Sequence, residues 1–196
     1  MPRSTASPRV VLVEDEAIIR LDLKELLEEE GYDVVGETGR GDEAIDLVRN
    51  LVPDLVILDV KMPGLDGLSA ARQITSERLA AVLILTAFSQ RDLVEQARDA
   101  GALAYLVKPF QKSDLMPAIE VALARHTELT SLERHVEDLE ERLESRKLID
   151  RAKGRLMDEQ GYDEQAAWRF IQTQAMSSRV KIGEIARRII DGELTP

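Results

Sequence analysis

A chain of 196 residues, 44% of them hydrophobic, is long enough to form one domain of ordinary size and a smaller second one. It has no cysteine, which excludes disulfides, thiolate metal sites and a cysteine nucleophile. The net charge of −11 argues against a nucleic-acid partner for the chain as a whole. The charge is uneven, however, because residues 146–196 hold 10 Lys and Arg against 8 Asp and Glu, whereas residues 1–145 hold 16 against 29.

Residues 1–8 are polar and contain Pro and Ser, so we expect a flexible tail there. They lack the apolar core of a signal peptide, and no apolar run in the chain approaches the length of a membrane span. The absence of cysteine suits a reducing cytosol. These features predict a soluble, cytoplasmic protein.

Short apolar runs and amphipathic helical segments alternate five times between residues 9 and 125. The runs that we expect to form strands are residues 9–13, 33–37, 55–58, 81–85 and 103–107. Regular alternation of strand and helix predicts an α/β domain, in which a doubly wound, five-stranded parallel sheet has helices on both faces.

Polar residues follow the expected strands where they end: Glu14 and Asp15, Asp59, Thr86 and Lys108. The carboxyl ends of parallel strands meet at one edge of the sheet, which is where ligands bind in such folds. Carboxylates that converge there repel one another, and Mg²⁺, which prefers oxygen ligands, relieves that repulsion. With donors from a lysine and a hydroxyl beside the metal, the site suits a phosphoryl group, and Asp59 is the candidate nucleophile for forming an acyl phosphate.

Each of these residues, taken singly, has a purely structural alternative. In that alternative, Asp59 ends a strand, Asp15 caps a helix and Thr86 is a strand-end hydroxyl. Tyr105, which lies within the last expected strand, is by itself a half-buried strand aromatic. The chain contains no GxxxxGK[ST] loop and no GxGxxG fingerprint, so nucleotide binding has no support.

The chain resembles the receiver domain of two-component response regulators in the order and spacing of a set of motifs across residues 9–125. These are Glu14-Asp15, Asp59, Met62-Pro63, Asp66-Gly67, Thr86-Ala87, Tyr105 and Lys108-Pro109. The resemblance implies a flavodoxin-like receiver that a sensor histidine kinase phosphorylates on Asp59. It implies a signalling phosphoacceptor and not an enzyme, with at most slow Mg²⁺-dependent autophosphorylation from small phosphodonors and autodephosphorylation.

The resemblance also implies roles for the residues around the phosphoacceptor. Asp15, Asp59 and the backbone carbonyl of Lys61 ligate Mg²⁺, and Glu14 does so through water.

Lys108 contacts the phosphoryl oxygens in the same scheme. Thr86 moves toward the phosphoryl group and Tyr105 rotates inward, which shifts a balance between inactive and active states. A cis peptide bond is implied before Pro109.

A helix is expected to begin near Ser113, and no Gly or Pro interrupts it between Ala118 and Lys153. Within residues 126–145, apolar side chains alternate in spacings of three and four: Leu129, Leu132, Val136, Leu139 and Leu143. This is the pattern of a coiled-coil seam, over about two heptads, and we expect a coiled-coil linker helix. Packing of the stripe against the chain's own domains is the alternative.

Residues 146–196 contain three amphipathic segments, which together bury only a small core that includes Trp168 and Phe170. This part resembles an ANTAR domain, a three-helix RNA-binding antitermination output. The matching segments are Leu148 to Met157 (LIDRAKGRLM), Ala166-Ala167-Trp168, Ala175-Met176 and Val180 to Ile190. The chain departs from the family pattern at Gln172 and Thr173, where relatives often carry basic residues.

The ANTAR resemblance implies that the partner is RNA, in the form of stem-loops in nascent transcripts. Basic residues supply the candidate phosphate contacts: Arg146, Lys147, Arg151, Lys153, Arg155, Arg179, Lys181, Arg187 and Arg188. We favour Lys153 and Arg151, because Arg187 and Arg188 have an alternative reading as cations attracted to the end of a helix.

Together the resemblances imply a phosphorylation-dependent transcription antitermination regulator. Homodimerisation on phosphorylation is expected through the coiled-coil seam, the face around Tyr105, or both. Two alternatives stay open. Three helices also build a DNA-binding helix-turn-helix, and a phospho-switch can act through protein contacts alone.

Overall fold

The computed structural model describes residues 7–87 and 91–194, so residues 1–6 of the expected flexible tail lie outside the described residues. The chain divides into two compact units, Met1–Leu129 and Thr130–Pro196. The long helix α5 (Lys112–Gln160) contributes residues to both of them. We describe each unit separately.

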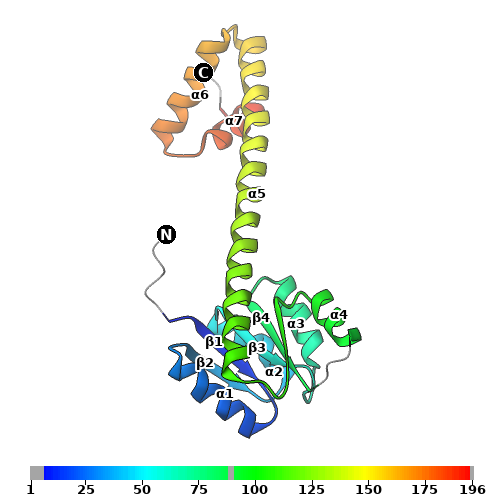
Figure 1. Ribbon diagram of the computed structural model, residues 1–196. Coiled ribbons are helices and arrows are strands. Elements are labelled where there is room, and N and C mark those ends of the chain that lie inside the picture. The colour runs from blue at the N-terminus through cyan, green and yellow to red at the C-terminus, as the bar shows by residue number, and fades with distance from the viewer. Residues whose placement is uncertain (1–6, 88–90, 195–196) are drawn as a thin grey trace. The chain divides into compact units, whose positions relative to one another are not determined.

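The first unit is built on a five-stranded sheet in the order β2-β1-β3-β4-β5, in which all neighbouring strands are parallel. The strands are β1 (Arg9–Val13), β2 (Asp33–Thr38), β3 (Leu55–Asp59), β4 (Ala81–Thr86) and β5 (Ala104–Val107). This order confirms the predicted doubly wound α/β fold. The sheet and its helices are seen in Figure 1.

Helices cover both faces of the sheet because alternate residues of each strand point to opposite sides. Val11 and Val13 belong to a core shared with α2 (Gly41–Leu51), α3 (Gly67–Ser76) and α4 (Arg91–Asp99). Val10 and Leu12 belong to a second core with α1 (Ala17–Glu29) and the first turns of α5. Strands buried on both faces are typical of parallel sheets and explain the continuous apolar runs in the sequence.

Residues with specific backbone roles mark the loops at the carboxyl edge of the sheet. Asp66 caps α3, since its side chain accepts a hydrogen bond from the Ser69 backbone N–H at 2.9 Å. The peptide bond between Lys108 and Pro109 is cis, as the family resemblance implies.

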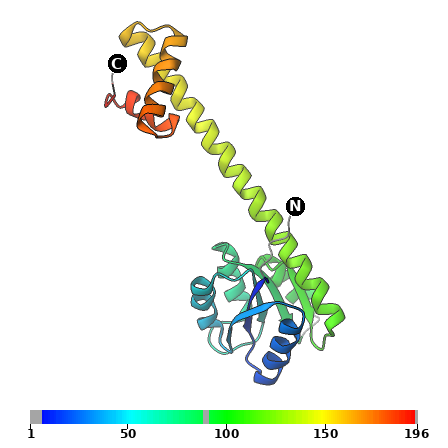
Figure 2. The same cartoon turned by 90° about the vertical axis from the view of Figure 1, so that its left-hand side faces the viewer.

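The second unit consists of the later part of α5 together with α6 (Glu164–Ser178) and α7 (Ile182–Ile190). Figure 2 shows α6 and α7, in orange and red, beside the yellow end of α5. Small and branched residues from all three helices form one core: Ala152, Leu156, Ala167, Ile171, Ala175, Ile185, Ala186 and Ile189. The alanines allow the helices to approach closely.

Residues 126–145, the expected coiled-coil linker, lie wholly within the continuous helix α5. Their apolar seam is exposed, with exposed fractions from 47% for Val136 to 63% for Leu139. None of the described helices is long and apolar enough to cross a membrane.

Candidate functional site

Two neighbouring strands bring three carboxylates together at the carboxyl edge of the sheet. Glu14 and Asp15 follow β1, and Asp59 is the last residue of β3. One carboxylate oxygen of each lies within 4.8 Å of the others. Glu14 and Asp59 are only 1% and 7% exposed, whereas Asp15 is exposed to solvent. The sequence prediction that these acids converge matches this geometry.

Lys108, directly after β5, lies against two of these carboxylates. Its Nζ donates hydrogen bonds to Glu14 Oε2 at 2.6 Å and to Asp59 Oδ2 at 2.9 Å. Burial alone lowers the pKa of the Lys108 ammonium, but the hydrogen bonds to Glu14 and Asp59 outweigh burial and its pKa is raised. The lysine is therefore firmly cationic beside Asp59.

Glu14 is an unusual position for a carboxylate because its side chain is almost completely buried. Burial raises the pKa of its carboxyl, the hydrogen bond from Lys108 opposes this, and the nearby charge of Asp59 raises the pKa further. The net shift is upward. Such a group favours any additional cation that enters the acidic cluster, because a cation stabilises its charged form.

The donor set of this cluster fits Mg²⁺. All three side chains offer oxygen, and the exposed Asp15 leaves one side open to the water that Mg²⁺ retains in protein sites. Lys108 pairs with Glu14 and Asp59 but leaves the Asp15 carboxylate without an ion pair among the described residues.

Thr86 and Tyr105 lie near this edge on the adjoining strands. Thr86 is fully buried at the end of β4, and its backbone carbonyl accepts a hydrogen bond from the Lys108 N–H at 2.7 Å. Tyr105 is half-buried, pairs in register with Ile84 and packs on the core that includes α4. Lys61 lies in the exposed loop that follows β3.

From the sequence, Gly67 is named only as part of the Asp66-Gly67 motif, without a role of its own, yet the geometry of the site requires glycine there. A Cβ at this position would lie 1.9 Å from the backbone oxygen of Asp59, so no other residue fits without moving the loop. Its N–H also bonds to the Val60 carbonyl at 2.9 Å. The sequence feature that could have indicated this role is the glycine of the Asp66-Gly67 pair.

In the second unit, several of the predicted RNA-binding cations already contact carboxylates. Lys153 pairs with Asp150 at 3.0 Å and with Glu164 at 2.9 Å, and Lys147 pairs with Glu144 at 2.7 Å.

Two more of the predicted RNA-binding cations also contact carboxylates. Lys181 pairs with Glu141, and Arg155 donates to Glu159 and to the backbone oxygen of Ile190 at the end of α7. Arg155 therefore stabilises the helix packing of this unit.

The remaining predicted cations make no ion pair with any residue that the structure describes: Arg146, Arg151, Arg179, Arg187 and Arg188. All but Arg188 are exposed.

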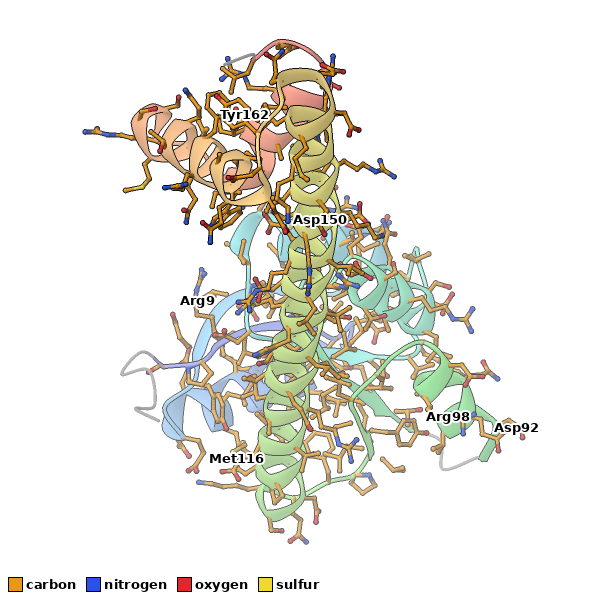
Figure 3. The ribbon with its side chains drawn as sticks, turned by 90° about the horizontal axis from the view of Figure 1, so that it is seen from above. Arg9, Asp92, Arg98, Met116, Asp150 and Tyr162 are labelled. Atoms are coloured by element: carbon orange, nitrogen blue, oxygen red, sulfur yellow. The ribbon has the colours of Figure 1, made fainter. Side chains whose placement is uncertain are left out.

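The expected core role of Trp168 is wrong. The buried positions of α6 are Ala167, Ile171 and Ala175, which follow one another at intervals of four. Trp168 lies one residue, and so about 100° of helix rotation, away from that stripe. Its side chain is 36% exposed, whereas Phe170 is half-buried against Tyr162, with ring centroids 6.0 Å apart. Tyr162 is labelled in Figure 3.

Comparison with known proteins identifies both units. Residues 10–120 match the response regulator receiver domain, and residues 137–190 match the ANTAR domain. The chain belongs to the response regulators that combine these two domains.

The transcriptional regulatory protein PdtaR of Mycobacterium tuberculosis is 55% identical over 188 residues, covering 96% of this chain and 92% of PdtaR. The chemotaxis protein CheY of Thermotoga maritima is 37% identical over 112 residues, covering 57% of this chain and 93% of CheY. A solved LuxR-family two-component response regulator from Aurantimonas matches with a TM-score of 0.57 and 35% identity, covering 61% of this chain and 86% of that one.

Membership of this family indicates the class of site to which the acidic cluster belongs. Receiver domains are signalling phosphoacceptors and bind Mg²⁺ at an acidic pocket, and the receiver domain of this chain carries an acidic cluster of Glu14, Asp15 and Asp59.

Proposed function

We propose that this protein is a phosphorylation-dependent antitermination regulator: a histidine kinase phosphorylates Asp59, and the ANTAR unit then binds RNA stem-loops in nascent transcripts. The observation that supports it best is the contact of Lys108 with Asp59 inside an acidic pocket, in a chain that also carries an ANTAR domain. The proposed place of action is the cytoplasm, where those transcripts are made.

The receiver chemistry follows from the groups around Asp59. A carboxylate oxygen of Asp59 attacks the phosphorus of a phosphohistidine, the P–N bond breaks, and the imidazole of the kinase leaves as the acyl phosphate forms. Lys108 is placed to neutralise the incoming phosphoryl oxygens because its Nζ is 2.9 Å from the attacking carboxylate.

When bound, Mg²⁺ supplies charge neutralisation to the phosphoryl group. We assign its ligands to Asp15, Asp59 and the backbone carbonyl of Lys61, with Glu14 acting through water. The same carboxylate cluster supports this assignment for the three acids.

The switch that we propose uses Thr86 and Tyr105. A phosphoryl group on Asp59 offers new acceptors to Thr86, which ends the next strand, β4. Movement at Thr86 reaches Tyr105 because β4 and β5 are paired at Ile84–Tyr105 and Thr86–Val107. Such a change shifts the population between two states of the receiver.

The output that we propose is RNA binding through the exposed cations of the ANTAR unit, foremost Arg146 and Arg151. Exposed Arg side chains suit phosphate contacts because guanidinium pairs with phosphate in bidentate geometry. We further propose that two copies pair through the seam from Leu129 to Leu143, whose side chains are all at least 47% exposed. Pairing of two ANTAR units raises their effective concentration on an RNA with two hairpins.

The direct test measures binding of a two-hairpin RNA to the wild type and to Asp59→Asn, each with and without Mg²⁺ and acetyl phosphate. Asp22→Asn, an exposed position on α1, serves as the control for the same chemical change. The expected result is tighter binding with phosphodonor for the wild type and the control but not for Asp59→Asn.

A preference for duplex DNA of equal length over the hairpins would favour a DNA-binding output instead. Absence of salt-dependent nucleic-acid binding under every condition would leave an output through protein contacts.

A further inference from the structure

One face of α5 and the exposed side of Trp168 enclose a depression of about 440 Å³, wholly within the second unit. Its lining consists of Arg142, Ser145, Arg146, Ile149, Asp150, Lys153 and Trp168. Asp150 is labelled on α5 in Figure 3. The volume lies within the range of sites for small ligands, and the lining includes Trp168, which is 36% exposed.

The charges in this wall favour an anion. The lining contains three cations and one acid, and the cations differ in the ion pairs that they already make. Arg142 pairs with Asp138 at 2.9 Å, and Lys153 is held by Asp150 and Glu164, whereas Arg146 makes no ion pair with a described residue. Arg146 is therefore the cation that can bind a phosphate without first breaking an ion pair.

Gly154 gives an independent indication that a ligand approaches this side of α5. It lies four residues after Asp150, on the same side of the helix and one turn further on. Glycine inside a helix costs about 1 kcal/mol relative to alanine. Apart from its chain neighbours and the nearby backbone of its own helix, a Cβ at Gly154 would meet no atom within 4 Å, so packing within the protein does not require glycine here. Close approach of a ligand backbone would require it.

We propose that this depression receives one unpaired nucleotide of an RNA loop, with its base stacked on Trp168 and its phosphate bound by Arg146, and that the RNA backbone passes Gly154. The inference rests on the proposed RNA-binding function and names where the loop is recognised. An unpaired base is the fitting occupant because only an unstacked base exposes a face to an aromatic ring, whereas the bases of a duplex are stacked on one another.

Tryptophan fluorescence can report binding at the depression, because Trp168 is the single tryptophan of the chain. The experiment titrates the phosphorylated wild-type protein with a two-hairpin RNA and records indole fluorescence, while a label on the RNA reports binding by anisotropy. Two control RNAs keep the stems, one with abasic loop positions and one with the loops replaced by a continuous duplex. We expect quenching by the intact hairpins and little quenching by either control.

Variants separate the roles of the lining residues. Trp168→Ala should weaken binding of the intact hairpins about 5- to 150-fold, the range of one lost base–aromatic stack, and Trp168→Phe should retain most of the affinity. Arg146→Gln should weaken binding, whereas Arg134→Gln, an exposed arginine of α5 outside the depression, should not. Gly154→Ala should weaken RNA binding while raising the thermal stability of the unit. Circular dichroism confirms that each variant is folded.

The outcomes distinguish this proposal from the one on which it rests. If the wild type binds the hairpins without a fluorescence change, or if Trp168→Ala binds them as tightly as the wild type, the nucleotide site is refuted and the RNA-binding function stands. If the wild type binds no RNA under any condition, both proposals fail.

Discussion

The Nζ atom of Lys108 lies 2.9 Å from Asp59 Oδ2 and, at the same time, 2.6 Å from Glu14 Oε2. Its side chain is 12% exposed, and those of Glu14 and Asp59 are 1% and 10% exposed. One buried cation thus bridges the carboxylates that end two neighbouring strands. Because the charges are nearly buried, their balance affects the stability of the receiver as well as its chemistry.

Lys108→Gln should destabilise the receiver by about 3 kcal/mol in metal-free buffer, because it leaves two buried carboxylates without their shared cation. Mg²⁺ should restore part of this loss. Hydrogen exchange of the β3 and β4 amides measures the opening of the receiver itself. Lys112→Gln, which removes an exposed ion pair to Glu30, is the matched control and should change exchange by much less. Equal protection of Lys108→Gln and wild type without metal would contradict the argument.

Asp15→Asn should remove most of the stabilisation that Mg²⁺ gives to the wild type. A ligand that binds only the folded state adds about 2.7 kcal/mol at a hundred times its dissociation constant. Asp15 is the exposed member of the cluster, so its substitution leaves the pairs of Lys108 intact. Thermal unfolding with increasing Mg²⁺ measures the effect. Asp22→Asn should keep the full Mg²⁺ response, and an equal response of Asp15→Asn would exclude Asp15 as a ligand.

The fold and the acidic site could be predicted from sequence because their signals are local and strong. The buried strands read as apolar runs, and parallel pairing then forces Glu14, Asp59 and Lys108 to the same edge. The bridging position of Lys108 between two acids was not predictable, because it depends on side-chain distances across three strands.

The output unit was harder to predict for a physical reason. In an α-helix, one residue of rotation, about 100°, decides between core and surface, as with Ala167 and Trp168 on α6. The pairing of Lys153 with Glu164 joins residues of two helices, and no sequence pattern indicates it. Lys153 and Arg151 were therefore favoured equally from the sequence.

Asp66 gives a pH-dependent contribution to receiver stability. Burial raises the pKa of its carboxyl, but hydrogen bonds from the Ser69 hydroxyl and backbone N–H outweigh burial, so the pKa is lowered from its usual value of 3.8. A carboxyl with a lowered pKa in the folded state stabilises the fold above pH 3.8, and this contribution is lost as pH falls through the folded pKa.

Asp66→Ala should consequently cost about 1 kcal/mol at neutral pH, as expected for loss of a helix N-cap, and less below pH 3.8. Asp66→Asn keeps an acceptor and should cost less than Ala at neutral pH. Urea unfolding at several pH values checks both. A cost of Asp66→Ala that does not change with pH would contradict the role of the charged cap.

Leu139→Glu should prevent the phosphorylation-dependent dimer that we propose, because it places a charge at the most exposed position of the seam. Sedimentation at micromolar concentration should show a monomer for the unphosphorylated wild type and a dimer after treatment with Mg²⁺ and acetyl phosphate. Ser131→Glu adds the same charge outside the seam and should dimerise normally. A tight dimer of the unphosphorylated wild type, or normal dimerisation of Leu139→Glu, would count against the seam.

Arg151→Gln and Lys153→Gln should differ in how they change the salt dependence of RNA binding. Each phosphate contact contributes about −0.7 to −0.9 to the slope of log affinity against log salt. Arg151 is exposed and makes no ion pair with a described residue, so its loss should reduce the slope by about one contact. Lys153 is only 19% exposed and already holds two carboxylates, so a phosphate must displace them before it gains a contact. Binding at four salt concentrations measures both slopes, and a larger change for Lys153→Gln would show that Glu164 releases the lysine when RNA binds.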